Sequence, residues 1–561
     1  MAFNVANFAR MPESKIGHSK FDRPNVLAGT CMHGKAVPIY CKLVSPGEVI
    51  KEKIYGNVRM STPIAPIYSS IKISFNAFFI PLRLVWEHTE EFFKTNKTSA
   101  GPQLVDYKIP MANFNTPSTS SVKVHSVSHY LGKPLYKGAT LETGAYYQKA
   151  SILKERAYWL TISEWYRMEQ VQNPIQIIKN DTGSIANENG VYKNVSSECA
   201  SVLKDFDYFT TCTRSPQYGP DVILPLGSVA PLTTGSMYEL PSAIKVNAGN
   251  DGTTRALVKD AYDQVSLDIS NPIASSTQLL AATKTNLYAD LSSATAASID
   301  ELYLAMAAQA WYHNANYGSR YFEMLQIHYS VTNPDLVLQR PEHIGEAKRY
   351  IRVQQVLSTA GAATDDTTKL GQPGANSSTD IEVEFPRHSF GEWGYFMVIA
   401  STYHERYYPA GIQREDLYED MFDFFFPEFS NIGDMAVLKK ELFSASSLDP
   451  EDVFGFQEAW SEMRYTPNRV TGLFDPYVNA SNGITGHSNP IKGWVLSEKW
   501  NGAPSLSSEF LTEDREAIKD ALVTGANGPD YIFYYYFDET TLSEVPVYSK
   551  PGLPGRGRGI I

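Results

Sequence analysis

The chain has 561 residues, of which 43% are hydrophobic and 12% aromatic, so it is long enough to bury a large core. Its formal net charge is −12, from 49 Lys and Arg against 61 Asp and Glu. The longest apolar runs, such as 395–400, are far shorter than a membrane span, and the N-terminus has no apolar signal region. We therefore expect a soluble, non-exported chain with no membrane insertion.

Two strands are predicted near the N-terminus. The first covers 36–44 and ends at the turn signal Ser45-Pro46-Gly47. The second covers 71–77, where apolar and polar side chains alternate, so one face should meet a core and the other water. Residues 59–68 lie between them and contain two prolines, which predicts an extended connector.

Further elements are widely spaced along the chain. Their periodicity and capping signals predict, in chain order, helices over 154–172 and 298–312, strands over 350–357 and 395–403, a helix over 513–523 and a strand over 531–537. Strands with few helices, rich in Tyr and Phe, indicate an all-β protein.

Residues 227–297 have no strong period and contain no Trp, Phe, His or Cys. Such a long irregular stretch is either an inserted surface subdomain or disordered. Strand or helix signals over 255–267 and 277–291 favour the insertion. Residues 360–380 are similar but shorter.

Positive charge gathers at the two ends of the chain. Residues 1–60 hold nine basic and four acidic side chains, a net of +5, and residues 549–561 have a net of +3, which leaves −20 on residues 61–548. Basic ends on an acidic body suggest that the ends face a polyanion, although solvated termini or a tail docked on a neighbouring subunit explain the same residues. The DNA-facing candidates are Arg10, Lys15, Lys20, Arg23, Lys550, Arg556 and Arg558.

Sequence motifs for catalysis and metal binding are missing. There is no HExxH, no Walker-type loop, no GxGxxG after a strand and no GxSxG. His404-Glu405 and Glu87-His88 are adjacent pairs, and neighbours on a strand face opposite ways, so they ligate together poorly. We therefore predict no catalytic, cofactor-binding or metal-ligating residue, no cofactor and no enzyme activity. The four cysteines form no CxxC and are expected to be buried, reduced thiols.

Several long blocks resemble the major capsid protein of microviruses, the small single-stranded DNA bacteriophages, and in particular the gokushovirus branch. They lie in the expected order and cover most of the chain. The blocks are PIYCKLVSPGEV (38–49), RMSTPIAPIY (59–68), FFIPLRLVW (78–86), KDFDYFTTCTRSPQYGPDVILPL (204–226), YGSRYFEMLQIHYSVTNPDLVLQRPEHIG (317–345), FFFPEFSNIG (424–433) and FGFQEAWSEMRYTPNRVTGLF (454–474).

This resemblance implies an eight-stranded antiparallel jelly roll with long loop insertions and a few short helices. It implies a T=1 shell of sixty subunits around a circular single-stranded DNA genome, assembled in the bacterial cytoplasm and located in the virion. Residues 1–226 and 298–561 would form the jelly roll with its interface loops and C-terminal tail. Residues 227–297 would be the hypervariable loop, a three-fold protrusion that binds a host receptor.

The charge balance adds one expectation about partners. An acidic chain with small basic ends neutralises little of a genome that carries one charge per nucleotide. A separate small, basic DNA-packaging protein is therefore expected, which the resemblance also implies. Two other classes stay open: a receptor-binding or spike protein of β-rich fold, and a β-rich carbohydrate-active enzyme whose two carboxylates would have no fixed motif.

Overall fold

The computed structural model divides the chain into two compact units. Unit 1 holds residues 1–216 and 319–561, and unit 2 holds residues 217–318. The structure describes residues 17–64, 66–93, 96–98, 101–103, 107–113, 121–135, 149–216, 219, 232–234, 245–247, 254–259, 265–267, 287–289, 299–315, 318, 320–331, 339–357, 373–445, 449, 451–478, 491, 493–519, 521–523 and 528–547.

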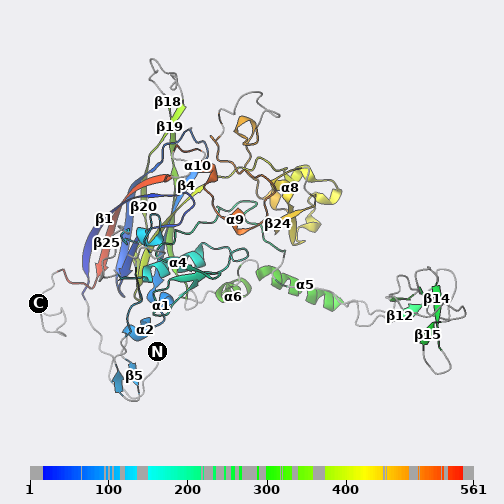
Figure 1. Cartoon of the computed structure of the whole chain (residues 1–561), viewed down its shortest axis with the longest axis horizontal. Helices are drawn as coiled ribbons and strands as arrows, with labels where there is room; N and C mark the ends of the chain where they lie inside the picture. The colour runs from blue at the N-terminus through cyan, green and yellow to red at the C-terminus, as the bar shows by residue number, and fades with distance from the viewer. Residues whose placement is uncertain are drawn as a thin grey trace, which may run out of the picture. The chain divides into compact units, whose positions relative to one another are not determined.

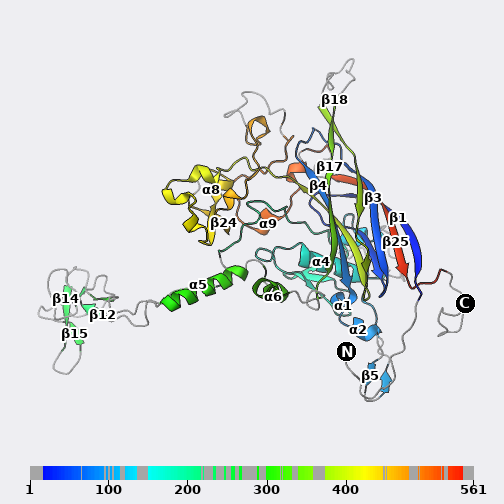
Figure 2. The same cartoon turned by 180° about the vertical axis from the view of Figure 1, so that it is seen from behind.

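Two antiparallel sheets form the centre of unit 1 (Figures 1 and 2). The first has the order β1-β25-β3-β20, and the second has the order β17-β4-β22-β2. The strands of the first sheet are β1 (Ser19–Cys31), β25 (Tyr531–Ser543), β3 (Val49–Met60) and β20 (Thr379–Glu384), with β21 (His388–Ser389) also paired to β3. The strands of the second sheet are β17 (Glu342–Ile351), β4 (Ile71–Pro81), β22 (Gly394–His404) and β2 (Val37–Val44).

Unit 1 also contains smaller elements. The paired short strands are β5 (Asn96–Thr98) with β6 (Gly101–Gln103), β7 (Met111–Asn113) with β8 (Lys149–Ser151), β9 (Gln176–Ile177) and β11 (Val191–Lys193) with β10 (Ala186–Glu188), β18 (Val353–Leu357) with β19 (Pro373–Ser377), and β23 (Asp434–Leu438) with β24 (Val453–Glu458). The helices are α1 (Leu82–Val85), α2 (Thr89–Phe93), α3 (Val127–Tyr130), α4 (Leu153–Trp165), α6 (Tyr321–Tyr329), α8 (Lys439–Leu442), α9 (Ser508–Leu511) and α10 (Glu516–Lys519). The 3₁₀ helices are η3 (Arg414–Leu417), η4 (Met421–Asp423), η5 (Pro427–Phe429), η6 (Ser461–Met463) and η7 (Gly472–Phe474).

The main core lies between the two sheets. Strand β25 shows why: Tyr531, Phe533, Tyr535 and Phe537 are buried, whereas the residues between them are exposed. Strand side chains alternate between faces, so this run presents one aromatic face to the interior. Its core partners from the second sheet include Ile71, Ile73, Phe75, Ala77, Phe396 and Val398.

A second core covers the outer face of the second sheet. Phe78 and Ile80 of β4 belong to a cluster that also contains Leu153, Ala157 and Tyr158 of α4. The expectation that the second face of 71–77 meets water is therefore wrong at Ser74, which is 1% exposed. The physical reason is that α4 and the chain around it cover this sheet, so β4 and β22 are buried on both faces.

The predicted strands are mostly confirmed. Predictions over 36–44, 71–77, 395–403 and 531–537 match β2, β4, β22 and β25. Residues 350–357 are instead divided between the end of β17 and the whole of β18, with Arg352 between them. Residues 59–68 are not all connector, because β3 continues to Met60.

The predicted helices and loops are confirmed less well. Helix α4 ends at Trp165 and so is shorter than 154–172, and within 513–523 the described helix is only α10. The irregular stretch 360–380 contains β19 and the start of β20, while 358–372 lie outside the described residues. The described cysteines are all unpaired, and Cys31, Cys199 and Cys212 are buried, as expected, whereas Cys41 is partly exposed.

Unit 2 is described by its short strands and one helix. The strands are β12 (Leu232–Thr234) paired with β16 (Leu287–Ala289), and β13 (Lys245–Asn247) and β15 (Val265–Leu267) paired with β14 (Thr254–Lys259). Helix α5 (Ile299–Asn314) matches the prediction over 298–312. The rest of 227–297 lies outside the described residues, so its exposure and its role stay predictions.

Candidate functional site

Two of the seven DNA-facing candidates lie within the described residues, both on β1. Lys20 Nζ is 3.2 Å from Asp22 Oδ1, and both side chains are exposed. Arg23 Nη1 is 3.9 Å from Glu539 Oε1. The other candidates, Arg10, Lys15, Lys550, Arg556 and Arg558, lie outside the described residues. Each described candidate therefore has an acidic neighbour, which the charge count of residues 1–60 did not reveal, and the role of all seven stays a prediction.

Residues 421–432 form an exposed aromatic segment. Two 3₁₀ helices, η4 and η5, carry large apolar side chains that face solvent. Those more than 40% exposed are Met421, Phe422, Phe424, Phe425 and Ile432. Soluble monomers rarely expose a contiguous apolar patch of this kind, and such patches commonly mark contacts between proteins. The sequence revealed the aromatic residues here but not their exposure.

The aromatic rings of this segment contact one another and the buried Trp460. The Phe422 and Phe429 centroids are 5.9 Å apart, and the Phe425 and Trp460 centroids are 5.4 Å apart. Edge-to-face contacts at these distances hold the rings in fixed positions. The exposed surface is thus an apolar patch of defined shape. The acidic side chains of Asp420, Asp423 and Glu428 lie in or next to the same segment.

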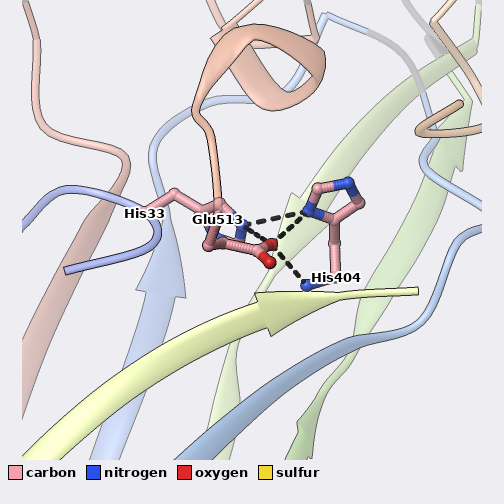
Figure 3. A group of neighbouring side chains, drawn as sticks. All are labelled: His33, His404 and Glu513. Atoms are coloured by element: carbon pink, nitrogen blue, oxygen red, sulfur yellow. Dashed lines mark hydrogen bonds and ion pairs between the residues drawn. The ribbon is translucent and has the colours of Figure 1, made fainter. Parts of the chain in front are cut away.

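A buried polar cluster lies where three distant segments of unit 1 meet (Figure 3). His33 follows β1, His404 ends β22, and Glu513 lies between α9 and α10. The three side chains are each less than 5% exposed. Their facing atoms are close: His33 Nε2 is 2.8 Å and His404 Nδ1 is 2.6 Å from Glu513 Oε1, and the two nitrogens are 3.1 Å apart.

Neighbouring groups fix each member of this cluster. The Tyr531 hydroxyl is 3.0 Å from His33 Nδ1, and the backbone N–H of His404 donates to Glu513 Oε1 at 3.1 Å. The second oxygen of Glu513 accepts a hydrogen bond from the Arg406 guanidinium. These contacts hold the rings and the carboxylate in the orientations that Figure 3 shows.

Burial sets the protonation of both rings. Burial, followed by the positive charge of Arg406, lowers the pKa of His404 to about 3. Burial, followed by the neighbouring His404, lowers the pKa of His33 well below its usual value. Both imidazoles are therefore neutral at neutral pH, since a charged ring would lose its hydration without a sufficient counter-charge.

A second set of ions surrounds the cluster. Glu498 is 2.9 Å from Lys204 Nζ and 3.2 Å from Arg406 Nε. Burial works to raise the pKa of Glu498, but these two cations together bring it below its usual value. The arrangement pairs each buried charge, which is what makes ion pairs tolerable in a protein interior.

The sequence does not reveal this cluster. The carboxylate next to His404 in the chain is Glu405, and Glu405 instead accepts a hydrogen bond from the Tyr407 hydroxyl. The residues that contact His404 lie 371 positions earlier and 109 positions later in the chain. No spacing motif links them, because the fold alone brings them together.

The chain was compared with known proteins. The family described as "Capsid protein (F protein)" matches residues 9–553. The chain is 28% identical to the capsid protein VP1 of Bdellovibrio phage phiMH2K, over 99% of this chain and 98% of that protein. It is 28% identical to capsid protein VP1 of Spiroplasma virus 4, over 98% of each, and 27% identical to that of Chlamydia phage 1, over 97% of each.

The matched residues, 9–553, include both central sheets and the segments between them. It confirms the resemblance to microviruses of the gokushovirus type, which rested on blocks spread over the same range. Among the described residues, no helix combines the length and apolar character needed to cross a membrane. The chain therefore belongs to the bacteriophage capsid protein (F protein) family and has a structural role in the virus shell.

Proposed function

We propose that this protein is the major capsid subunit of a small single-stranded DNA phage, and that sixty copies form a closed T=1 shell. The observation that carries the proposal is the family match over residues 9–553. A closed shell repeats the same contacts at every subunit, so each contact can be modest while the whole assembly is stable.

The eight strands in the two central sheets, apart from the two-residue β21, are proposed to form a jelly roll. Numbered along the chain from β1 to β25, they take the order one-eight-three-six in the first sheet and five-four-seven-two in the second. This is the order produced when an antiparallel ribbon wraps around a core as two Greek keys. The strand order supports the jelly roll, and the long connections between strands leave surface for contacts with neighbouring copies.

The exposed aromatic segment is the best described candidate for such a contact. Its large apolar side chains gain free energy when another copy covers them, at roughly 25 cal/mol for each Å² buried. Aromatic residues and Met are enriched in the buried centres of protein interfaces. A capsid subunit needs such surfaces, whereas a lone monomer would be prone to aggregate through them.

The shell is proposed to enclose circular single-stranded DNA with the help of a small basic packaging protein. The net charge of −12 supports a separate basic protein, since the chain cannot neutralise a genome by itself. Lys20 and Arg23, with the basic termini, would face the DNA. Locating these segments on the outer surface of the particle would contradict this part of the proposal.

Residues 227–297 are proposed to project outward and bind a host receptor. Their composition supports this, because they contain no Trp, Phe, His or Cys that a core would use. Deleting them should leave assembly intact and reduce adsorption of particles to cells. Loss of folding on deletion would instead show that they belong to the core.

Electron microscopy of the purified protein tests the class of function. Closed particles of roughly 250–300 Å, the size expected for sixty subunits of this mass in one layer, would support the capsid proposal. Trimers with fibrous projections would support a spike or receptor-binding protein instead. Virions purified from infected cells should contain the chain as their most abundant protein, with assembly taking place in the bacterial cytoplasm.

A further inference from the structure

We propose that His33, His404 and Glu513 form a binding site for a divalent transition metal ion, with Zn²⁺ as the best match. Three potential ligand atoms converge there from separate parts of the fold: His33 Nε2, His404 Nδ1 and Glu513 Oε1 (Figure 3). Two imidazole nitrogens and one carboxylate oxygen are a ligand set that zinc accepts, with a water molecule as fourth ligand. The site is additional to the proposed capsid function and does not depend on it.

The spacing of the three atoms suits a metal ion after a small movement. They lie 2.6 to 3.1 Å from one another. Ligands about 2.0–2.1 Å from a tetrahedral zinc ion lie about 3.3 Å apart, so the pairs must separate by about 0.2 to 0.7 Å. Side-chain torsions can supply that movement without a change in the backbone.

The neighbouring groups act as supports for the ligands. The Tyr531 hydroxyl contacts the ring nitrogen of His33 that faces away from the site. The Arg406 guanidinium contacts the oxygen of Glu513 that the site does not use. Metal-binding imidazoles and carboxylates normally have such hydrogen-bonded partners, because these fix the orientation of the ligand.

A cavity borders the site at His404. Its lining includes His404 together with Glu498, Asp514, Glu516 and Lys499, and its volume is about 540 Å³. Glu498 is already paired with Lys204 and Arg406. The negative charge that attracts a cation therefore comes from Asp514 and Glu516, against the single ammonium group of Lys499. The cavity also has room for the water molecule that would complete the coordination.

Metal binding would join three segments that are far apart in the sequence. His33 precedes β2, His404 ends β22 in the second sheet, and Glu513 lies between two short helices. An ion bound to the folded chain alone shifts the folding equilibrium toward the folded state. The expected consequence is a protein whose thermal stability depends on zinc.

The competing interpretation is a cluster held by hydrogen bonds alone. In that case His33 Nε2 and His404 Nδ1 both donate to Glu513 Oε1. Two substitutions separate the interpretations. The amide nitrogen of Asn occupies about the position of an imidazole Nδ1, and that of Gln the position of Nε2, and both donate hydrogen bonds but bind zinc poorly. His404→Asn and His33→Gln therefore keep the donors and remove the metal ligands.

Zinc binding to the purified protein is the test. After removal of metal with a chelator, we expect the wild-type protein to bind one Zn²⁺ per chain and to unfold at a higher temperature with zinc than without it. Cobalt(II) in place of zinc should give the visible absorption of a four-coordinate ion. His404→Asn and His33→Gln should weaken zinc binding on the order of 100-fold and abolish the zinc-dependent rise in Tm.

A surface histidine provides the matched control. His88 lies 3.0 Å from Glu91 and 3.7 Å from Asp181 and is partly exposed, so it could bind zinc adventitiously. His88→Asn should leave zinc binding unchanged. If the wild-type protein binds no zinc, or if both cluster variants bind it as the wild type does, the proposal is overturned. Should a cluster variant fail to fold, X-ray absorption of the zinc-loaded wild type decides, because it must show two imidazole ligands.

Discussion

Glu52 of β3 and Glu539 of β25 face each other across the first sheet as direct partners, and each is no more than 1% exposed. Their surroundings differ. Glu539 accepts hydrogen bonds from Lys42, at 2.7 Å, and from Tyr40 and Thr541. Neither oxygen of Glu52 has a hydrogen-bond partner among the described residues. Two neighbouring carboxyl groups inside a protein do not both ionise, because their negative charges would repel each other. The pair therefore consists of one carboxylate and one carboxylic acid.

The pKa values follow this division. Burial, followed by the charges of Glu539 and Asp538, raises the pKa of Glu52 to about 9. Burial also acts to raise the pKa of Glu539, but its hydrogen bonds from Lys42, Thr541 and Tyr40 bring it below its usual value. Near neutral pH, Glu52 is thus protonated and Glu539 ionised.

We predict that Glu52→Gln stabilises the protein above about pH 5. The unfolded chain loses the Glu52 proton near pH 4.5, whereas the folded protein keeps it up to about pH 9, so wild-type stability falls as pH rises between these values. The penalty at pH 7 is about 3 kcal/mol, and glutamine, which stays neutral, avoids it. Thermal unfolding at pH 8 should give a higher Tm for Glu52→Gln than for the wild type, and this difference should disappear at pH 4.

Glu539→Gln is the matched variant and should act in the opposite sense. The pKa of Glu539 is lowered on folding, so its contribution is present above the unfolded value and is lost as pH falls. Removing its charge leaves the Lys42 ammonium without this partner and destabilises the protein at pH 7. If both glutamine variants lower the Tm at pH 7, Glu52 is not the protonated member of the pair.

A second prediction concerns Arg156 of α4, whose side chain is fully buried. Its guanidinium donates to the backbone carbonyls of Val85, Asn180, Thr182 and Ser184 at 2.8 to 3.2 Å. Replacing it with Met keeps the apolar stem but leaves these carbonyls without their donor. We expect Arg156→Met to lower the free energy of unfolding by about 3–5 kcal/mol, measured by urea denaturation.

Arg156→Lys tests whether geometry or charge matters at this position. Lysine keeps the charge but cannot reach several carbonyls at once, because it lacks the forked guanidinium. We expect it to recover less than half of the lost stability. Full recovery would show that the charge of Arg156, and not its hydrogen bonds, stabilises the loop over 180–184.

The strands with a simple period were predictable from the sequence, and the polar sites were not. The run Tyr531–Phe537 alternates strictly, and one buried face follows directly from a two-residue repeat. By contrast, β1 contains Pro24 and is mostly exposed, so its sequence has no apolar repeat that would predict a strand. Its position is set by pairing with β25. The contacts of Glu52 with Glu539 and of His33 with Glu513 depend on chain-distant pairing, which no local pattern encodes.

A third prediction concerns Gly56 of β3, which lies very close to the neighbouring strand β25. A Cβ at Gly56 of β3 would lie 2.5 Å from the Tyr534 carbonyl oxygen and 2.6 Å from the Tyr535 ring. Both groups belong to β25, which pairs with β3, so relief requires the sheet to shift. We expect Gly56→Ala to destabilise the protein by about 1–3 kcal/mol. Gly391→Ala, where nothing lies within 4 Å, should leave the Tm nearly unchanged.

The last prediction tests the aromatic segment as a contact between copies. Phe422 is 65% exposed, so Phe422→Asp removes little from the folded monomer and should change its Tm by only a degree or two. In the shell the same change places a charge in an apolar contact, next to the acidic Asp420 and Asp423. We expect the yield of closed particles in sedimentation to fall at least tenfold. Val191→Asp, at a similarly exposed valine on β11, serves as the control and should assemble normally. Normal assembly of Phe422→Asp would mean that this segment lies on a free surface of the particle, and the subunit contacts must then be sought along the long connections of the two sheets.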